Sequence, residues 1–482
     1  MQSSIERRRG RGPQACLAAL ISLACGGDGE SPAQTGSESS TTVPVSTEGT
    51  SSTAITVTTA VDESSATTDT PAESSTTLET SGTTGEPIEP EVIFPRTSIV
   101  ASELAVLVND ADPQSVAVAD YYVNARQIPA ANLVHLNLPA GAVLSQADFA
   151  AAKATVDAAL GDEIQALAIT WTQPYRVDCM SVTSAFALGF DPQYCATPCN
   201  PSAPVDYYDS PSFAPWTDHG IRPAMMLAGS EIAQIQALVD RGVAADATWP
   251  VGDGYLIRTT DADRSTRSPS FIDTVALFDH EGGLPLEYID NSDGSGSDYI
   301  EDTQDVMFYF TGLMNVPQIA TNGYSPGAMA DHLTSYGGEV PTSSQMSVVA
   351  WLEAGATGSY GTVVEPCNFP AKFPNPLIAT AHYFRGQTLI EAYWKSVAQP
   401  GEGLFVGEPL ARPWDGAQVS FADGTLTIRT TLLAPGVDYE VQAGATADGP
   451  WETVFTGSVP YPVSIAIDVP DADAPYYRLV PS

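Results

Sequence analysis

The stretch that decides the fold lies between Asp305 and Asn368, and it contains DVMFYFTGLMNVP (305–317), SPGAMADHLTSYGG (325–338) and SSQMSVVAWLEAGATGSYGTVVEPCN (343–368). Residues 306–310 are apolar on both faces, which predicts a central strand of a sheet covered on both sides. Residues 328–333 and 358–364 predict two more strands, with a helix over 344–354 between them. Because parallel strands bring their carboxyl ends to one edge of a sheet, we expect a crevice after the first two of these strands.

Strands and helices also alternate in the residues before this stretch. The apolar run 103–108 predicts a strand. Asp112 and Pro113 then provide an N-cap and a first helical residue for a helix that ends near residue 126. Repeated units of this kind imply a mostly parallel sheet with flanking helices. The sequence therefore predicts an α/β domain over residues 96–413.

The pattern changes at residue 414. Short alternating segments are separated by turn signals such as Asp423-Gly424, Pro435-Gly436 and Asp448-Gly449-Pro450. Residues 414–482 therefore predict a small all-β sandwich of the fibronectin type, which acts either as a structural cap or as a binding module.

The first 95 residues predict export. Four arginines precede a short apolar run that ends at Cys25, so residues 1–25 are interpreted as a lipoprotein-type signal peptide with lipid attachment at Cys25. An ordinary signal peptide cut nearby is the alternative. Residues 26–95 are rich in Ser and Thr and have little to bury, which predicts a disordered tether to the outer membrane or the cell surface. The whole chain carries 58 acidic and 19 basic residues, a net charge of −39, which excludes nucleic acid as a partner.

Four cysteines remain after the signal, and in an exported protein an even number predicts disulfides. These residues are Cys179, Cys195, Cys199 and Cys367. Three pairings are open, and Cys367 is expected to pair with a cysteine of the 179–199 loop. A zinc site formed by the first three cysteines with His219 is the alternative, although the tight paired spacing of structural zinc sites is missing.

An acidic loop suggests one cofactor. Asp293, Asp298 and Asp302 supply hard oxygen ligands that could hold calcium, but their spacing is not that of an EF-hand. A solvated loop without any cofactor is the preferred interpretation.

Several motifs carry a family resemblance. Residues 105–116, the DHLTSYGG motif (331–338), the WLEAGATGSYGTVVEPCN motif (351–368) and VGEPLARP (406–413) resemble an uncharacterised family of exported bacterial proteins without a known activity. More distantly, the order of elements resembles gingipain-type cysteine peptidases of the caspase-like clan. That resemblance implies a His-Gly after the strand 306–310 and a Cys after the strand 328–333.

Neither residue of that catalytic pair is present. Thr311 and Gly312 stand at the histidine position, and Ser335 stands near the cysteine position. Ser335 would need a base to act as a nucleophile. His332 is three residues away and should point to the opposite face of an extended strand, and His219 is the other candidate.

Three functions are compatible with these features. The first is a tethered, non-catalytic surface protein that uses a peptidase-like domain to bind an unknown extracellular ligand. The second is an exported hydrolase with Ser335 as nucleophile, and the third is a carbohydrate- or matrix-binding protein that acts through residues 414–482. The sequence favours the first.

Overall fold

A computed structural model describes residues 89–195 and 199–482. Contacts divide the chain into residues 1–82 and residues 83–482, so all described residues belong to the second unit. The predicted signal peptide, the lipid attachment at Cys25 and most of the predicted tether lie outside the described residues.

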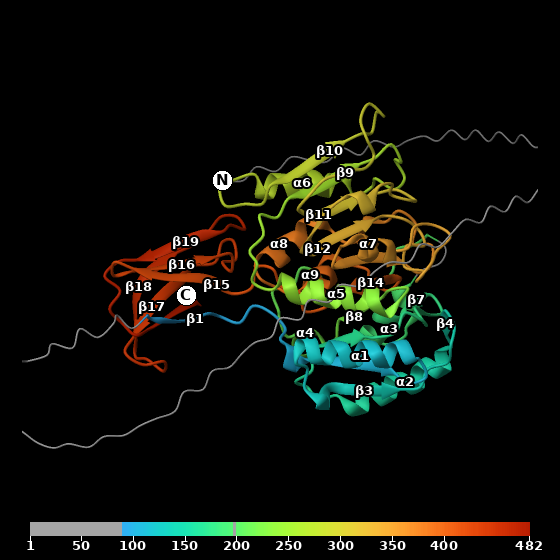
Figure 1. Cartoon of the computed structure of the whole chain (residues 1–482), viewed down its shortest axis with the longest axis horizontal. Helices are drawn as coiled ribbons and strands as arrows, with labels where there is room; N and C mark the ends of the chain where they lie inside the picture. Colours follow the sequence, from blue (N-terminus) through green and yellow to red (C-terminus); the bar gives the residue numbers. More distant parts are fainter. Residues whose placement is uncertain (1–88, 196–198) are drawn as a thin grey trace, which may run out of the picture. The chain divides into compact units, whose positions relative to one another are not determined.

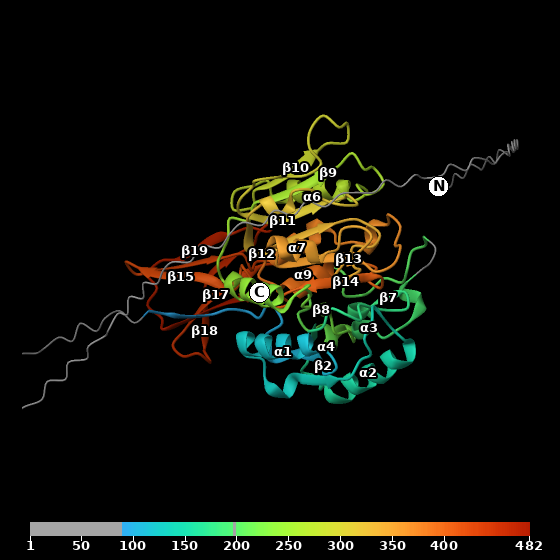
Figure 2. The ribbon, with the colours of Figure 1, turned by 45° about the vertical axis from the view of Figure 1, so that its right-hand side comes forward.

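A ten-stranded sheet forms the centre of the α/β domain (Figure 1). Its strands follow the order β10 (Leu286–Asp290), β9 (Gly254–Arg258), β11 (Val306–Thr311), β12 (Tyr324–His332), β13 (Gly358–Thr362), β14 (Gly403–Gly407), β8 (Ala224–Met226), β5 (Ala166–Ile169), β2 (Leu104–Asn109) and β3 (Leu133–Leu136). All neighbours are parallel except β13 and β14. The sheet therefore consists of two parallel halves that run in opposite directions and meet at β13 and β14 (Figure 2).

The central strands are buried because their side chains are apolar on both faces. Every residue of β2, β5 and β11 is buried. A strand covered on both faces has this near-continuous apolar pattern, since helices pack on each side of a parallel sheet. The predicted α/β class with a mostly parallel sheet is confirmed.

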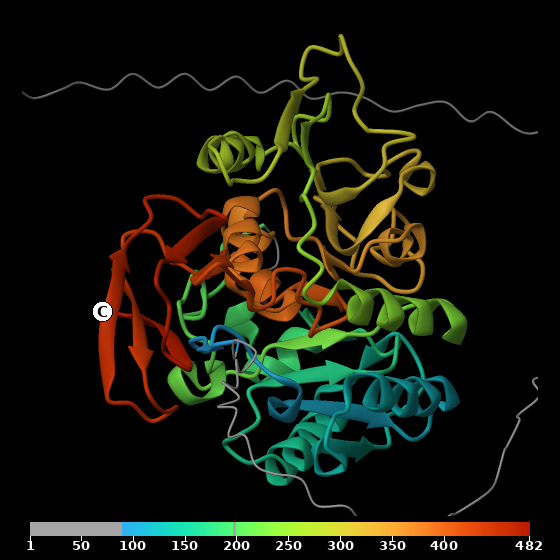
Figure 3. The same ribbon diagram turned by 60° about the vertical axis from the view of Figure 1, so that its left-hand side comes forward.

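Helices cover both faces of the sheet (Figure 3). One layer contains α1 (Pro113–Arg126), α5 (Ile232–Ala245) and α7 (Val349–Ala354). The other contains α2 (Gln146–Ala159), α3 (Val182–Leu188), α6 (Ser268–Phe278), α8 (Pro376–Phe384) and α9 (Leu389–Ser396), while the short α4 (Pro215–His219) precedes β8. A minor sheet of β4 (Val143–Leu144), β6 (Arg176–Val177) and β7 (Met180–Ser181) lies beside them. As predicted, Asp112 caps α1 by accepting from the backbone N–H of Gln114, with Pro113 as its first residue.

The C-terminal residues form two facing sheets around a separate core. One sheet contains β1 (Glu91–Ile93), β20 (Tyr476–Pro481), β17 (Tyr439–Gly444) and β18 (Trp451–Gly457), and the other contains β15 (Ala417–Ala422), β16 (Thr425–Thr430) and β19 (Ile465–Val469). Leu426, Ile467, Val441 and Leu479 from the two sheets share one apolar cluster, so the predicted sandwich is present. Its boundaries differ from the prediction, because Trp414 belongs to the core of the α/β domain and residues 91–93 of the predicted tether pair with β20.

Two disulfides cross-link the α/β domain. They join Cys179 to Cys195 and Cys199 to Cys367, with Cα separations of 5.9 and 5.3 Å. This pairing confirms the predicted disulfides and replaces the zinc alternative. Disulfides of this kind are typical of oxidising compartments, as in exported proteins. No helix in the described part of the chain is long and apolar enough to cross a membrane.

Candidate functional site

The predicted crevice lies where β11 and β12 end side by side. The two strands are parallel neighbours, and Thr311 is in register with His332. A cavity of about 390 Å³ opens there and is lined by Asp263, Arg264, Leu333, Thr334, Ser335, Glu365, Pro366, Cys367 and Asn368. We call it the β12 mouth. Its charged lining groups are the carboxylates of Asp263 and Glu365 and the guanidinium of Arg264, which come from the loops that follow β9 and β13.

Ser335 lies in the β12 mouth without a base. All five histidines are among the described residues, and none of them lines this cavity. Within residues 89–195 and 199–482, no hydrogen bond reaches the Ser335 hydroxyl, while its carbonyl accepts from Thr362 Oγ1 at 2.9 Å. The two glycines that follow press on β13, since a Cβ at Gly338 would come within 2.4 Å of the Gly361 carbonyl. The Ser-Tyr-Gly-Gly turn therefore has a structural role, because its glycines let the backbone pass close to β13.

His332 faces the core, as its spacing from Ser335 predicts. Its ring is 1% exposed, and its Nδ1 accepts a hydrogen bond from Trp351 Nε1 at 2.9 Å. Burial, with the positive charge of Arg267, lowers the pKa of His332 to about 3. A neutral imidazole in this orientation fixes Trp351 and cannot take a proton from Ser335.

His219 is hydrogen-bonded to a different serine, Ser210. It ends the short helix α4, and its Nε2 lies 2.9 Å from Ser210 Oγ. Ser210 Oγ also accepts the backbone N–H of Ser212, which leaves its own hydrogen for the imidazole. Of the three predicted catalytic residues, Ser335, His332 and His219, the structure brings no two together.

Thr311 and Gly312, which stand where the peptidase resemblance implies a His-Gly, have structural roles in this chain. Thr311 is fully buried, and its Oγ1 lies 3.4 Å from the Ile257 carbonyl. Thr170, at the end of the third strand of the other half-sheet, makes the matching bond to the Leu107 carbonyl at 3.0 Å. A Cβ at Gly312 would lie 2.0 Å from the Arg264 carbonyl oxygen, so no side chain fits at that position.

Beneath the mouth lies a buried ion pair that no local sequence pattern predicts. Arg267 Nη2 lies 2.6 Å from Asp331 Oδ1, and both side chains are 1% exposed. The same guanidinium donates to the carbonyls of Thr311 and Pro374. Burial raises the pKa of Asp331, and the charge of Arg267 opposes that shift. The pair joins the loop before α6 to the ends of β11 and β12, which makes it a structural feature of the mouth.

The predicted calcium ligands do not gather around one point. Asp298 accepts from the backbone and hydroxyl of Thr260, at 2.7 and 2.5 Å, and from Asn291 at 2.7 Å. Asp293 caps a turn by accepting from the Ser295 N–H. The part of the chain that the structure describes contains no group of three or more His, Cys, Asp or Glu side chains that could hold a metal ion, so these carboxylates close a loop.

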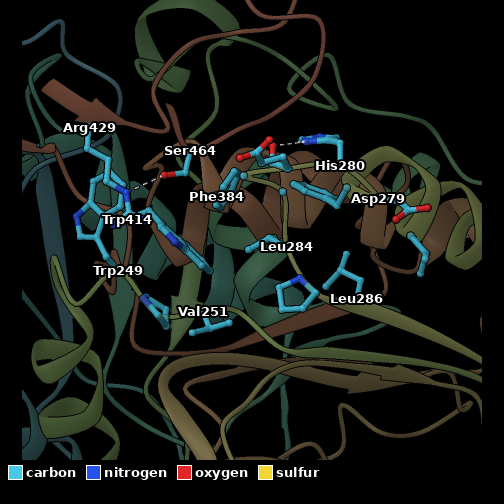
Figure 4. A pocket seen from close by; sticks show the side chains of 17 residues that line it. Trp249, Val251, Asp279, His280, Leu284, Leu286, Phe384, Trp414, Arg429 and Ser464 are labelled. Carbon is cyan, nitrogen blue, oxygen red and sulfur yellow. Dashed lines mark hydrogen bonds between the residues drawn. The ribbon is translucent and has the colours of Figure 1, made fainter. Parts of the chain in front are cut away.

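A larger cleft lies between the α/β domain and the sandwich (Figure 4). Its volume is about 910 Å³, and we call it the Trp249 cleft. The lining residues are 249–251, Val275, 278–286, Phe384 and Trp414 of the α/β domain, and Arg429 and Ser464 of the sandwich. Figure 4 shows Trp249 and Arg429 at one end and Asp279 and His280 at the other.

The floor of the Trp249 cleft is apolar and its rim is polar. Phe278, Leu284, Phe384 and Trp414 are buried, with at most 5% of each exposed. The rim carries the exposed groups Asp279, Glu281 and Arg429, beside Val251, which is 73% exposed. An apolar floor with a few polar groups around it is the usual composition of a ligand site at a domain boundary.

Three contacts hold the two walls of this cleft in place. The backbone N–H of Ser464 donates to the Gly282 carbonyl at 2.8 Å. His280 stacks on Tyr461 of the sandwich with ring centroids 5.1 Å apart. Arg429 donates to Ser464 Oγ at 3.2 Å, and its guanidinium lies 5.9 Å from the centre of the Trp249 ring. The rim is therefore arranged before any ligand arrives.

Local sequence patterns do not predict this cleft, because the segments that form its walls lie far apart in the chain. Its only local signal is the run Trp249-Pro250-Val251, apolar residues in a loop where burial is not expected. No protein family model, no curated protein and no solved structure matches the chain.

Proposed function

We propose that this chain is an exported, lipid-anchored surface protein that binds a neutral oligosaccharide in the Trp249 cleft without catalysing a reaction. Lipidation at Cys25 would tether it to the cell envelope through residues 26–95. The observation that carries the proposal is the cleft itself, where an indole at the rim stands beside carboxylate, guanidinium and hydroxyl groups.

The chemistry of the rim favours a sugar. The apolar C–H face of a pyranose packs against an indole ring, here that of Trp249. The hydroxyl groups of a sugar both donate and accept hydrogen bonds, which suits a rim holding carboxylates (Asp279, Glu281) as well as donors (Arg429, Ser464). The net charge of −39 disfavours anionic polymers, so the expected ligand is neutral.

The placement of the histidines supports binding over hydrolysis. Nucleophilic catalysis by Ser335 needs a base within hydrogen-bond reach. His332 cannot be this base because its Nδ1 accepts a hydrogen bond from Trp351, and His219 cannot because its Nε2 is hydrogen-bonded to Ser210.

The proposal is tested by screening the full chain on an array of neutral oligosaccharides and measuring the strongest binder by calorimetry. Trp249 has a positive φ of 51°, so Trp249→Asn removes the indole while keeping a residue that tolerates this backbone conformation. We expect it to weaken binding by about thirtyfold or more, as for a central aromatic contact. Trp451→Ala is the matched control, because Trp451 also lies under an arginine, Arg478, but outside the cleft. Equal affinity of both variants would refute the proposed site.

The lipid anchor has a separate test. Cells that express the full chain are fed an alkyne-tagged fatty acid, and the chain is isolated and probed for the tag. We expect labelling that Cys25→Ser abolishes, whereas unlabelled parent protein would contradict the anchor.

A further inference from the structure

A second cavity of about 340 Å³ lies where the α/β domain meets the sandwich, and it has an unusual charge. Arg96 and Arg385 line it, and none of its lining residues is acidic. The chain as a whole carries about three acidic residues for each basic one, so a cavity with this composition is unexpected. We call it the Arg385 pocket.

Arg385 makes no direct ion pair in the described part of the chain, and the charge of Asp209 acts on it only through space. Its Nε donates to the Ala381 carbonyl at 3.3 Å, and its Nη2 donates to His382 Nδ1 at 3.1 Å. His382 must then carry its hydrogen on Nε2, which donates to Asp209 Oδ1 at 3.0 Å. The imidazole thus separates the guanidinium from the nearest carboxylate, and Nη1 of Arg385 is left without a hydrogen-bond acceptor among residues 89–195 and 199–482.

Two more groups present donors to the same pocket. Gln387 is 6% exposed, and its Oε1 accepts from the Lys395 ammonium at 2.7 Å, so its amide NH₂ remains available. The Tyr439 hydroxyl accepts the Ala434 N–H at 3.1 Å, so its own hydrogen remains available. Three donors with no opposing carboxylate are the arrangement that binds an anion.

The other walls of the pocket are apolar. Phe213 and Leu432 line it together with three prolines. Arg96, whose guanidinium lies 4.8 Å from the centre of the Phe213 ring, is held at the rim by an ion pair with Glu103. We propose that the Arg385 pocket binds a small organic carboxylic acid, whose carboxylate accepts from Arg385, Gln387 and Tyr439 and whose apolar body packs on Phe213 and Leu432.

The test uses benzoate as the probe and benzamide, which has the same shape without the charge, as its control. Binding of benzoate and benzamide to the full chain is measured by ligand-observed proton NMR, and sodium sulfate, which has no proton signal, is titrated as a competitor of benzoate to test charge alone. We expect benzoate to bind at least about tenfold more tightly than benzamide or sulfate. Equal binding of benzoate and benzamide, benzoate binding no tighter than sulfate, or no binding of benzoate, would overturn the proposal.

Variants separate the site from the fold. Arg385→Gln should weaken benzoate binding by about tenfold or more. Gln387→Glu keeps the acceptor for Lys395 but places a carboxylate oxygen toward the pocket, so it should weaken benzoate binding at least as much while preserving the melting temperature. Arg429→Gln, which removes an arginine of the Trp249 cleft, should leave benzoate binding unchanged. Retained affinity in both pocket variants would exclude this site, and the outcome does not depend on whether the Trp249 cleft binds sugar.

Discussion

Replacing His332 by Gln should remove much of the acid sensitivity of this fold. The unfolded chain takes up a proton at this imidazole below a pKa of about 6.5, whereas burial lowers the folded pKa to about 3. The folded state therefore binds fewer protons between these values. The contribution of His332 is fully present above pH 6.5 and is lost as the pH falls through 3.

The magnitude follows from the two pKa values. The difference between 6.5 and about 3, at 1.36 kcal/mol for each unit of pKa shift, amounts to about 5 kcal/mol of stability that the parent protein loses through this residue alone as the pH falls from above 6.5 to below 3. His332→Gln keeps a side-chain acceptor for Trp351 and has no group that titrates. Its free energy of unfolding should therefore fall less steeply with acidity than that of the parent.

The assay is urea unfolding, monitored by tryptophan fluorescence, at intervals from pH 8 to pH 3.5. Measurement at pH 8, where the imidazole is neutral in both states, gives the cost of the substitution apart from titration. His382→Gln is a useful comparison, because burial lowers the pKa of His382 to about 4 and its effect should be smaller, about 3 kcal/mol. Parallel pH profiles for the parent and His332→Gln would refute the view of His332 as a buried neutral group.

Two further predictions concern the fold around the β12 mouth. The Cys199–Cys367 disulfide spans 168 residues and the Cys179–Cys195 disulfide spans 16. Replacing both cysteines of a disulfide by serine should therefore lower the free energy of unfolding by about 5 kcal/mol for the first disulfide and by about 3 kcal/mol for the second, measured by urea unfolding without a reductant. A larger loss from the shorter loop would contradict this reasoning. Gly312→Ala should cost about 1–3 kcal/mol in the same assay, since the new Cβ overlaps a backbone carbonyl, and an unchanged midpoint would show that the loop can yield.

Local sequence patterns predicted the parts of the fold that local physics controls. The apolar run of β11 and the Asp112 cap of α1 were found because burial and capping leave a mark on adjacent residues. Strand β14 has no recognisable local pattern. It is five residues long, has Gly403 and Gly407 at its ends, and pairs with strands from distant parts of the chain. Its antiparallel pairing with β13 divides the sheet, and no short-range pattern encodes that.

The site shows the same division. The crevice after β11 and β12 was predicted because strand direction fixes it, and the opposite orientation of His332 was predicted from the spacing along an extended strand. The Trp249 cleft was not predicted, because Trp249 and Arg429 come from segments 180 residues apart that meet only through the packing of the sandwich. Long-range packing of this kind is read from a structure.

We propose that the chain binds its ligand in the Trp249 cleft and that the β12 mouth is not catalytic. The most direct measurement is calorimetric binding of the strongest oligosaccharide to two variants of the full chain, Trp249→Asn and Ser335→Ala. We expect Trp249→Asn to weaken binding by about thirtyfold or more, while Ser335→Ala binds as the parent does. Loss of binding in Ser335→Ala with full affinity in Trp249→Asn would contradict it.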